Sequence, residues 1–511
     1  MKNPSSYILK KLVFILTLIV FSVLQSPAQQ DYFQQEVNTV IRVSLDDQTH
    51  SLSGNIFIEY TNNSNLALDT IYLHLWANAF QSKSSAFTKQ KLRHKDSNFY
   101  FTDEKNMGGY DSLQFKIEGV PAKWAFHPKY NDVAYILLEK SLKPEESTTI
   151  SSGFKLKIPG QFSRLGYEKN PKKDLDPFQS YQITQWFPKP AVFDASGWHP
   201  MPYLDMGEFY SEFGDYDVTI TLPENYMVAA TGELLTTSEL ERIQKRIEYT
   251  DDFLTSNRKE IEGISASGKK KTIRFIAENV HDFAWFANKS FLIKEGKITI
   301  DQGESIKSQV FFLPDERNTW KQSLEYLERG TRFYIDKVGP YPYSKVAVVQ
   351  GPLLAGGGME YPMITIISEG SGGKSLDQVI THEIGHNWFY GILAFNEREY
   401  PWMDEGINSY YDHRYSKHNY PPKESKFWAP RVIRTALDSK LEHIYHEFAH
   451  SKALAQPSDL HSNEFTLTNY FLGAYENPAR AFTYLEKYLG TALFDSVMQS
   501  FYKKWALKHP G

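Results

Sequence analysis

Two histidines and a distant carboxylate constrain this chain more than any other feature. The stretch VITHEIGHNWFYG, residues 379–391, places His382 and His386 four positions apart, and Glu405 follows with eighteen residues between. Residues four apart lie on one side of a helix, about 5–6 Å from each other. A second helix that begins near Trp402 and packs antiparallel to the first would bring Glu405 to the same point. The sequence therefore predicts two packed helices whose polar side chains converge.

Such a convergence suits a metal ion. Two neutral imidazoles and one carboxylate are the ligands of a catalytic zinc, which keeps a fourth position open to water. The chain contains no cysteine, so disulfides, thiolate ligands and a cysteine nucleophile are excluded. Asp404 is an alternative to Glu405, but on a helix it points about 100° away. We predict one Zn²⁺ per chain, bound by His382, His386 and Glu405, against the alternative of two partly exposed helical histidines.

Glu383 has a different role in this prediction. It follows His382 by one helical step, so it reaches the open coordination position instead of the metal. Zinc lowers the pKa of a bound water to roughly 7, and a neighbouring carboxylate can take the proton as the water attacks a carbonyl. General-base assistance of this kind is worth about 10²–10⁴ in rate. The site is therefore predicted to be hydrolytic, with Glu383 as the general base.

The hydrophobic pattern changes along the chain and indicates a multidomain protein. Alternation of period two, as in 216–226 and 272–280, predicts antiparallel strands up to about residue 290. From about 320 the spacing becomes helical, as in 320–339. We expect an N-terminal β-rich domain over 29–291 and an α+β domain over 292–511.

Local signals within the second domain set further expectations. Ser375 followed by Gln378 resembles a capping box, so the helix that carries the histidines should begin near Leu376 and stop at Gly391. Segment 491–505 predicts a helix with one buried face. The residues expected on that face are Phe494, Val497, Met498, Phe501 and Trp505.

A glycine-rich turn lies between two further predicted strands, 345–350 and 363–368. If 363–368 is an edge strand, it can pair with the backbone of an extended peptide. Gly357 and Gly358 would admit close approach of that peptide, because neither carries a side chain. Both glycines are therefore candidate substrate-binding residues.

The first residues have the pattern of a secretory signal. A basic start precedes the apolar run 12–24, and the small residues Ser26 and Ala28 follow. We expect 1–28 to be a signal peptide cleaved before Gln29, with export to the periplasm or secretion and no stable membrane insertion afterwards. The alternative is an uncleaved anchor, although the run is shorter than the roughly 20 residues of a spanning helix. The small net charge of −5 gives no reason to expect nucleic acid as a partner.

The spacing H-E-x-x-H-x18-E resembles that of the M1 family of zinc aminopeptidases, the gluzincins that include aminopeptidase N and leukotriene A4 hydrolase. The segment GGGMEYP, residues 356–362, is similar to the G-x-M-E-N segment of that family. The resemblance implies that Glu360 binds the free α-amino group of the substrate. Tyr361 stands where the family has asparagine, which could reshape the pocket near the scissile bond.

Two more segments carry the resemblance. GAYENPARAFTYLEKYLG, residues 473–490, is similar to the family stretch that begins Y-E-K-G, which implies that Tyr475 donates a hydrogen bond to the tetrahedral oxyanion. Asn477 and Pro478 replace Lys-Gly, and a proline is tolerated in the first turn of a helix. YQITQWFPKPAVFD, residues 181–194, resembles the segment whose glutamine or glutamate helps to hold the amine, which would be Gln185.

The resemblance implies a fold and an activity. The fold is a saddle-like antiparallel β-rich domain followed by a thermolysin-like α+β catalytic domain, which here ends early and is expected to be incomplete at its C-terminus. The activity is that of a zinc-dependent aminopeptidase acting on peptides with a free N-terminus through a zinc-activated water. An endopeptidase with the same metal site and a non-catalytic peptide-binding protein are the alternatives. The oligomeric state and the preferred N-terminal residue stay open.

Overall fold

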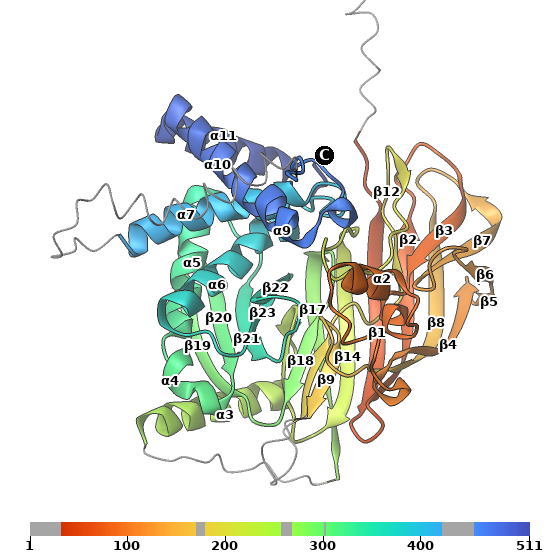
Figure 1. Cartoon of the computed structure of the whole chain (residues 1–511). Coiled ribbons are helices and arrows are strands. Elements are labelled where there is room, and N and C mark those ends of the chain that lie inside the picture. The colour runs from red at the N-terminus through yellow and green to blue at the C-terminus, as the bar shows by residue number, and fades with distance from the viewer. Residues whose placement is uncertain (1–31, 170–178, 257–267, 301–302, 422–453, 511) are drawn as a thin grey trace, which may run out of the picture.

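The computed structural model describes residues 32–169, 179–256, 268–300, 303–421 and 454–510. The predicted signal peptide lies outside these residues, and its cleavage stays a prediction. Among the described residues, no helix is long and apolar enough to cross a membrane. A β-rich N-terminal half is followed by a helical C-terminal region, which confirms the predicted fold class (Figure 1).

The largest sheet has eight strands and lies in the β-rich half (Figure 1). Its central strands β1 and β14 alternate buried and more exposed residues, so one face of the sheet packs on the core. These two strands pair in parallel, whereas β1 pairs with β2 in the antiparallel direction. The sheet order is β16 (Glu233–Leu234), β17 (Lys270–Val280), β14 (Gly214–Pro223), β1 (Glu36–Asp46), β2 (Ser51–Thr61), β8 (Ser147–Lys157), β4 (Gly109–Ile117) and β5 (Val120–Pro121).

Smaller sheets and two helices complete this half. One four-stranded sheet runs β11 (Lys189–Pro190), β3 (Leu68–His74), β7 (Val133–Leu142) and β6 (Lys123–Phe126). A second runs β15 (Met227–Ala230), β18 (Trp285–Asn288), β10 (Gln179–Ile183) and β9 (Gly166–Lys169), and β12 (Phe193–Asp194) pairs with β13 (Gly197–Trp198). The helices are α2 (Ala86–Arg93) and α3 (Thr237–Thr255).

A five-stranded mixed sheet carries the helical region. Its order is β19 (Leu292–Thr299), β20 (Ser305–Phe312), β21 (Lys345–Gly351), β23 (Ile364–Ser368) and β22 (Gly358–Tyr361). The prediction that 363–368 forms an edge strand is wrong, because the glycine-rich segment supplies β22, which pairs antiparallel to β23 and covers it. The edge strand on this side of the sheet is therefore β22, and Met359, Glu360 and Tyr361 on it are buried.

Helices α5 and α6 pack together beside this sheet, and α7 packs on α6 (Figure 1). The capping-box prediction is wrong: α6 begins at Gly373, Gly372 precedes it without a side-chain cap, and Ser375 lies inside the helix. The helix ends at His386, and a wider π-type turn continues past Gly391. The helices of this region are α4 (Arg317–Trp320), α5 (Ser323–Lys337), α6 (Gly373–His386), α7 (Ile407–Asn419), α9 (Leu467–Tyr470), α10 (Asn477–Leu489) and α11 (Thr491–Trp505).

Helix α11 coincides with the predicted segment 491–505. Phe494 and Met498 are buried as expected, but Val497 is 50 % exposed and lies on the outer side of the helix. Pro478 occupies the first turn of α10, the position at which a proline was expected to be tolerated.

Candidate active site

Three predicted ligands meet between α6 and the turn that precedes α7. The Nε2 atoms of His382 and His386 lie 3.1 Å apart, and Glu405 Oε2 lies 3.3 Å from each of them. His386 and Glu405 are buried, and His382 is partly buried. The structure thus brings one oxygen and two nitrogens to a single point.

The approach of Glu405 depends on close packing behind it. Glu405 lies in a π-type turn, Trp402–Gly406, that runs directly into α7 at Ile407, so a helical segment begins near Trp402 as predicted. A Cβ on Gly406 would lie 2.4 Å from Pro478 Cβ and 2.8 Å from the Ala474 carbonyl oxygen. The glycine lets the start of α10 press against this turn.

Two aspartates orient the imidazoles, a role that the sequence analysis assigned to neither of them. Asp412 Oδ2 lies 2.6 Å from His382 Nδ1, and Asp404 Oδ1 lies 2.7 Å from His386 Nδ1. Because a carboxylate only accepts, each Nδ1 is the donor and each Nε2 of a neutral ring presents a lone pair. Asp404 therefore supports a ligand and does not replace Glu405. Asp412 lies seven residues after Glu405, which is about two helical turns. This spacing places both carboxylates on one side of the helical segment and could have pointed to Asp412.

These contacts test whether zinc fits. Two atoms bound about 2.0–2.1 Å from one tetrahedral ion lie roughly 3.3–3.4 Å apart, which agrees with the separations around His382, His386 and Glu405. Two lone pairs at 3.1 Å repel unless a cation lies between them. Glu405 Oε2 is buried with no hydrogen-bond donor among the described residues. The donor set therefore fits Zn²⁺.

The charge around the ligands also favours a cation. Burial by itself would lower the pKa of His386, but the carboxylates of Asp404, Glu360 and Glu405 hold that pKa well above its usual value. Burial would also lower the pKa of His382, but nearby carboxylates, chiefly that of Asp412, raise this pKa well above its usual value. The surrounding acids thus stabilise positive charge at this point.

Replacing Asp412 by asparagine is expected to weaken zinc binding about 10–100-fold, the usual cost of losing a carboxylate that orients a histidine ligand. Competition with a chromogenic chelator measures this affinity. Asp495→Asn is the matched control. Asp495 pairs with Arg414, which lies on α7 as Asp412 does, and Asp495 does not contact the ligands. Equal zinc affinity of Asp412→Asn and wild type would contradict the orienting role.

Glu383 lies on the same side as the ligands. It is 5 % exposed, and its Oε2 has no hydrogen-bond partner among the described residues. Burial raises the pKa of this carboxyl to about 7. Carboxylate oxygens of Glu383 and Glu360 and a nitrogen of His386 all lie within 4.8 Å of one another. Glu383 is thus placed to receive a proton next to the metal position.

Gly358 makes room for this glutamate. A Cβ on Gly358 would lie 2.4 Å from Glu383 Cγ and 2.5 Å from its Cδ and Oε1. The close approach expected at Gly358 is therefore made by Glu383 of the same chain. At Gly357 an added Cβ would meet only Val379, at 3.9 Å, and the Gly357 carbonyl accepts a bond from Ser368 N at 2.9 Å.

Gly358→Ala is expected to lower kcat by about 10–100-fold, because the methyl group must displace the Glu383 carboxylate and misplaced catalytic groups cost on this scale. Steady-state kinetics with an aminoacyl reporter, together with zinc content, measures the effect. Gly153→Ala is the control. Gly153 lies on β8 of the eight-stranded sheet, and an added Cβ would meet only Asn55 Oδ1, at 3.4 Å. A kcat unchanged in Gly358→Ala would show that Glu383 does not need this space.

Glu360 and Gln185 are not brought into contact. Glu360 is 6 % exposed, and its Oε1 has no hydrogen-bond partner among the described residues. One of its carboxylate oxygens lies within 4.8 Å of a nitrogen of His386. Gln185 Oε1 instead accepts a hydrogen bond from Tyr361 at 3.4 Å. Successive strand residues point to opposite faces, so Gln185 contacts the neighbour of Glu360. Within the described part of the chain, no hydrogen bond joins the two predicted amine-binding side chains.

Tyr475 lies at the metal site. Its hydroxyl donates a hydrogen bond to Glu405 Oε1, and its ring stacks near that of His382 with centroids 6.2 Å apart. Burial, reinforced by the charge of Glu405, raises the pKa of the Tyr475 hydroxyl well above its usual value, so it remains a donor. The residue sits in a π-type turn, Phe471–Glu476, directly before α10.

Part of this chain resembles known peptidases. The family model described as the peptidase family M1 domain matches residues 322–509. Aminopeptidase M1-C of Oryza sativa subsp. japonica is 24 % identical over 217 residues, which are 40 % of this chain and 24 % of that protein. Aminopeptidase B of Rattus norvegicus is 32 % identical over 95 residues, which are 18 % of this chain and 14 % of that protein. The matched region thus spans about a quarter or less of these relatives.

Solved structures share the fold over a longer stretch. The M1 zinc metallopeptidase of Deinococcus radiodurans is 14 % identical, with a TM-score of 0.55 over 94 % of this chain and 88 % of that chain. A mutant of the same enzyme bound to a Tyr-Ser-Ala substrate has a TM-score of 0.56 with the same identity and coverage. The donor set and the family both indicate zinc, as predicted. Residues 322–509 of this chain thus resemble the peptidase family M1 domain.

Proposed function

We propose that this chain is a zinc-dependent aminopeptidase that removes N-terminal residues from peptides. The observation that carries the proposal is the convergence of His382, His386 and Glu405 at the separations of a tetrahedral site, with Glu383 beside them. The names of the matched relatives support the same activity, since they include aminopeptidases. The tripeptide bound to the Deinococcus radiodurans mutant supports a peptide substrate.

The residues divide the chemistry among them. When bound, zinc lowers the pKa of water to about 7 and polarises a carbonyl. Glu383 takes the proton of the attacking water and returns it to the leaving amine, a general-base and general-acid role. Tyr475 donates a hydrogen bond to the oxygen on which negative charge develops. Glu360 accepts from the substrate ammonium.

Glu360 alone gives limited selectivity for a free N-terminus. A hydrogen bond to a charged group contributes about 1.5–3 kcal/mol, which corresponds to roughly 10- to 100-fold. Strict exopeptidase action therefore needs a second amine partner or a closed end of the cleft. Gln185 remains the proposed partner and would have to turn away from Tyr361 to reach the amine.

Blocking the substrate amine tests the proposal. We expect an aminoacyl reporter with a free N-terminus to be cleaved, its N-acetylated form to be cleaved at least about 10-fold more slowly, and both activities to disappear with a zinc chelator. Liquid chromatography of a short peptide and its acetylated form gives the same comparison with a natural bond. Equal cleavage of both forms would indicate an endopeptidase. No cleavage of either form by the zinc-loaded protein would indicate a non-catalytic peptide-binding protein.

A further inference from the structure

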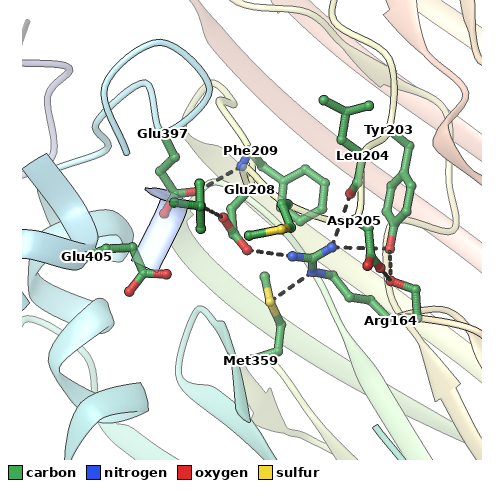
Figure 2. Close-up of polar contacts among 12 residues, drawn as sticks. Arg164, Tyr203, Leu204, Asp205, Glu208, Phe209, Met359, Glu397 and Glu405 are labelled. Carbon is green, nitrogen blue, oxygen red and sulfur yellow. Dashed lines mark hydrogen bonds and ion pairs between the residues drawn. The ribbon is translucent and has the colours of Figure 1, made fainter. Parts of the chain in front are cut away.

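A buried glutamate of the β-rich half lies beside the catalytic site. Glu208 follows β13 in the chain and is 8 % exposed. Its Oε1 accepts a hydrogen bond from Arg164 Nη2 at 2.5 Å, and its Oε2 accepts one from the Tyr470 hydroxyl at 3.0 Å. Figure 2 shows its carboxylate between Arg164 and the side of the site that carries Glu405. Both carboxylate oxygens are thus engaged, one on each side.

Arg164 connects this glutamate to the strand that carries Glu360. The guanidinium is 1 % exposed, and its Nε donates to Met359 Sδ at 3.0 Å (Figure 2). Met359 precedes Glu360 on β22. Arg164 Nη1 also donates to the Leu204 carbonyl at 3.2 Å, which ties it to the segment that leads to Glu208. The guanidinium therefore bridges β22 and the β-rich half.

Tyr470 connects the same glutamate to the oxyanion tyrosine. It is the last residue of α9, and the turn that holds Tyr475 begins at the next residue. The rings of Tyr470 and Tyr475 meet edge to face with centroids 5.9 Å apart. A shift of Tyr470 would therefore move the turn that presents the Tyr475 hydroxyl.

The backbone at Glu208 is held from the metal side. Arg398 Nη2 donates to the Glu208 carbonyl oxygen at 2.9 Å, and the backbone N–H of Phe209 donates to Glu397 Oε2 at 2.8 Å. Glu397 and Arg398 lie on the loop that leads to Glu405. The segment around Glu208 thus contacts the loop that leads to Glu405 and, through Tyr470, the turn that holds Tyr475. Through Arg164 it also contacts β22, which carries Glu360.

We infer that Arg164 and Glu208 are positioning residues of the active site. Their ion pair fixes Tyr470, and through it the turn of Tyr475, relative to the strand of Glu360. The inference rests on the proposed peptidase function. A buried ion pair is a weak source of stability by itself, but removal of one partner leaves an uncompensated charge and rearranges its surroundings. Misplacement of catalytic groups by about 1 Å can cost on the order of 10² in rate.

A double-mutant cycle in the zinc-loaded enzyme tests this pair of contacts. Glu208→Gln and Tyr470→Phe should each lower kcat by about 10- to 100-fold while KM changes less than about threefold. The loss of kcat in the double variant should be no greater than the larger single loss, because both changes remove the same hydrogen bond, from the Tyr470 hydroxyl to the Glu208 carboxylate. Glu239→Gln is the control: Glu239 on α3 forms another largely buried ion pair, with Lys271, and its loss should leave kcat unchanged.

A crystal structure of Glu208→Gln gives a readout that needs no turnover. We expect the Tyr470 hydroxyl to move by about 1 Å or more while the zinc remains bound. A wild-type kcat in Glu208→Gln, fully additive losses in the double variant, or a Tyr470 that stays in place would overturn the inference. If wild-type protein binds zinc but cleaves no peptide, the proposed function fails, and the position of Tyr470 still decides the positioning role.

Discussion

Replacing Glu383 by glutamine is expected to lower kcat by about 10²–10⁴ and to leave bound zinc in place. Glutamine has the same size and hydrogen-bonding reach, but its amide cannot take a proton from water. The burial that raises the pKa of Glu383 to about 7 suits it to exchange protons near neutral pH. Steady-state kinetics on an aminoacyl reporter, with zinc measured on the same sample, gives the result.

Glu328→Gln serves as the control for this substitution. Glu328 lies on α5 and accepts a hydrogen bond from Ser308 at 2.7 Å, away from the metal ligands. Its replacement should leave kcat within about twofold of wild type, as for a surface change that touches no catalytic group. A Glu383→Gln enzyme with wild-type kcat and full zinc would contradict the general-base role.

Replacing Glu405 by glutamine is expected to remove zinc and activity together. The neutral amide is a poorer ligand than a carboxylate, and the two Nε2 lone pairs then face each other at 3.1 Å without the third donor. The loss of zinc affinity should exceed the roughly 10–100-fold that follows from disturbing a supporting carboxylate. Zinc content after dialysis against a weak chelator measures it.

A second readout of the Glu405 substitution is thermal stability. Zinc binds only the folded site, so added zinc should raise the melting temperature of wild type and have a much smaller effect on Glu405→Gln. Stoichiometric zinc retained by Glu405→Gln after dialysis would show that the third ligand lies elsewhere. Glu360 is the nearest alternative, since a carboxylate oxygen of Glu360 lies within 4.8 Å of a nitrogen of His386.

The sequence predicted the convergence of His382, His386 and Glu405 because it depends on local spacing. His382 and His386 share a helix face, and Glu405 follows at a fixed distance on the next element. The π-type turns Asn387–Ile392 and Trp402–Gly406 were not predicted, because such turns depend on tertiary packing and not on a capping signal. The edge strand was misplaced for a related reason, since four residues of a glycine-rich segment pair as β22 only when β23 lies beside them.

Long-range contacts escaped the sequence altogether. Arg164 and Glu208 come from loops of the β-rich half, and neither lies in a recognisable motif. Gln185 lies in a segment that resembles a family motif, but the sequence did not predict that its side chain contacts Tyr361. Such pairings depend on how the two halves pack, which residue spacing along one chain does not encode.

The most direct test of the metal site is anomalous diffraction from crystals of the zinc-loaded protein, recorded on both sides of the zinc absorption edge. We predict one strong anomalous peak, about 2.0–2.2 Å from His382 Nε2, His386 Nε2 and a carboxylate oxygen of Glu405. No peak between these three side chains, or a peak that Glu405 does not reach, would contradict it.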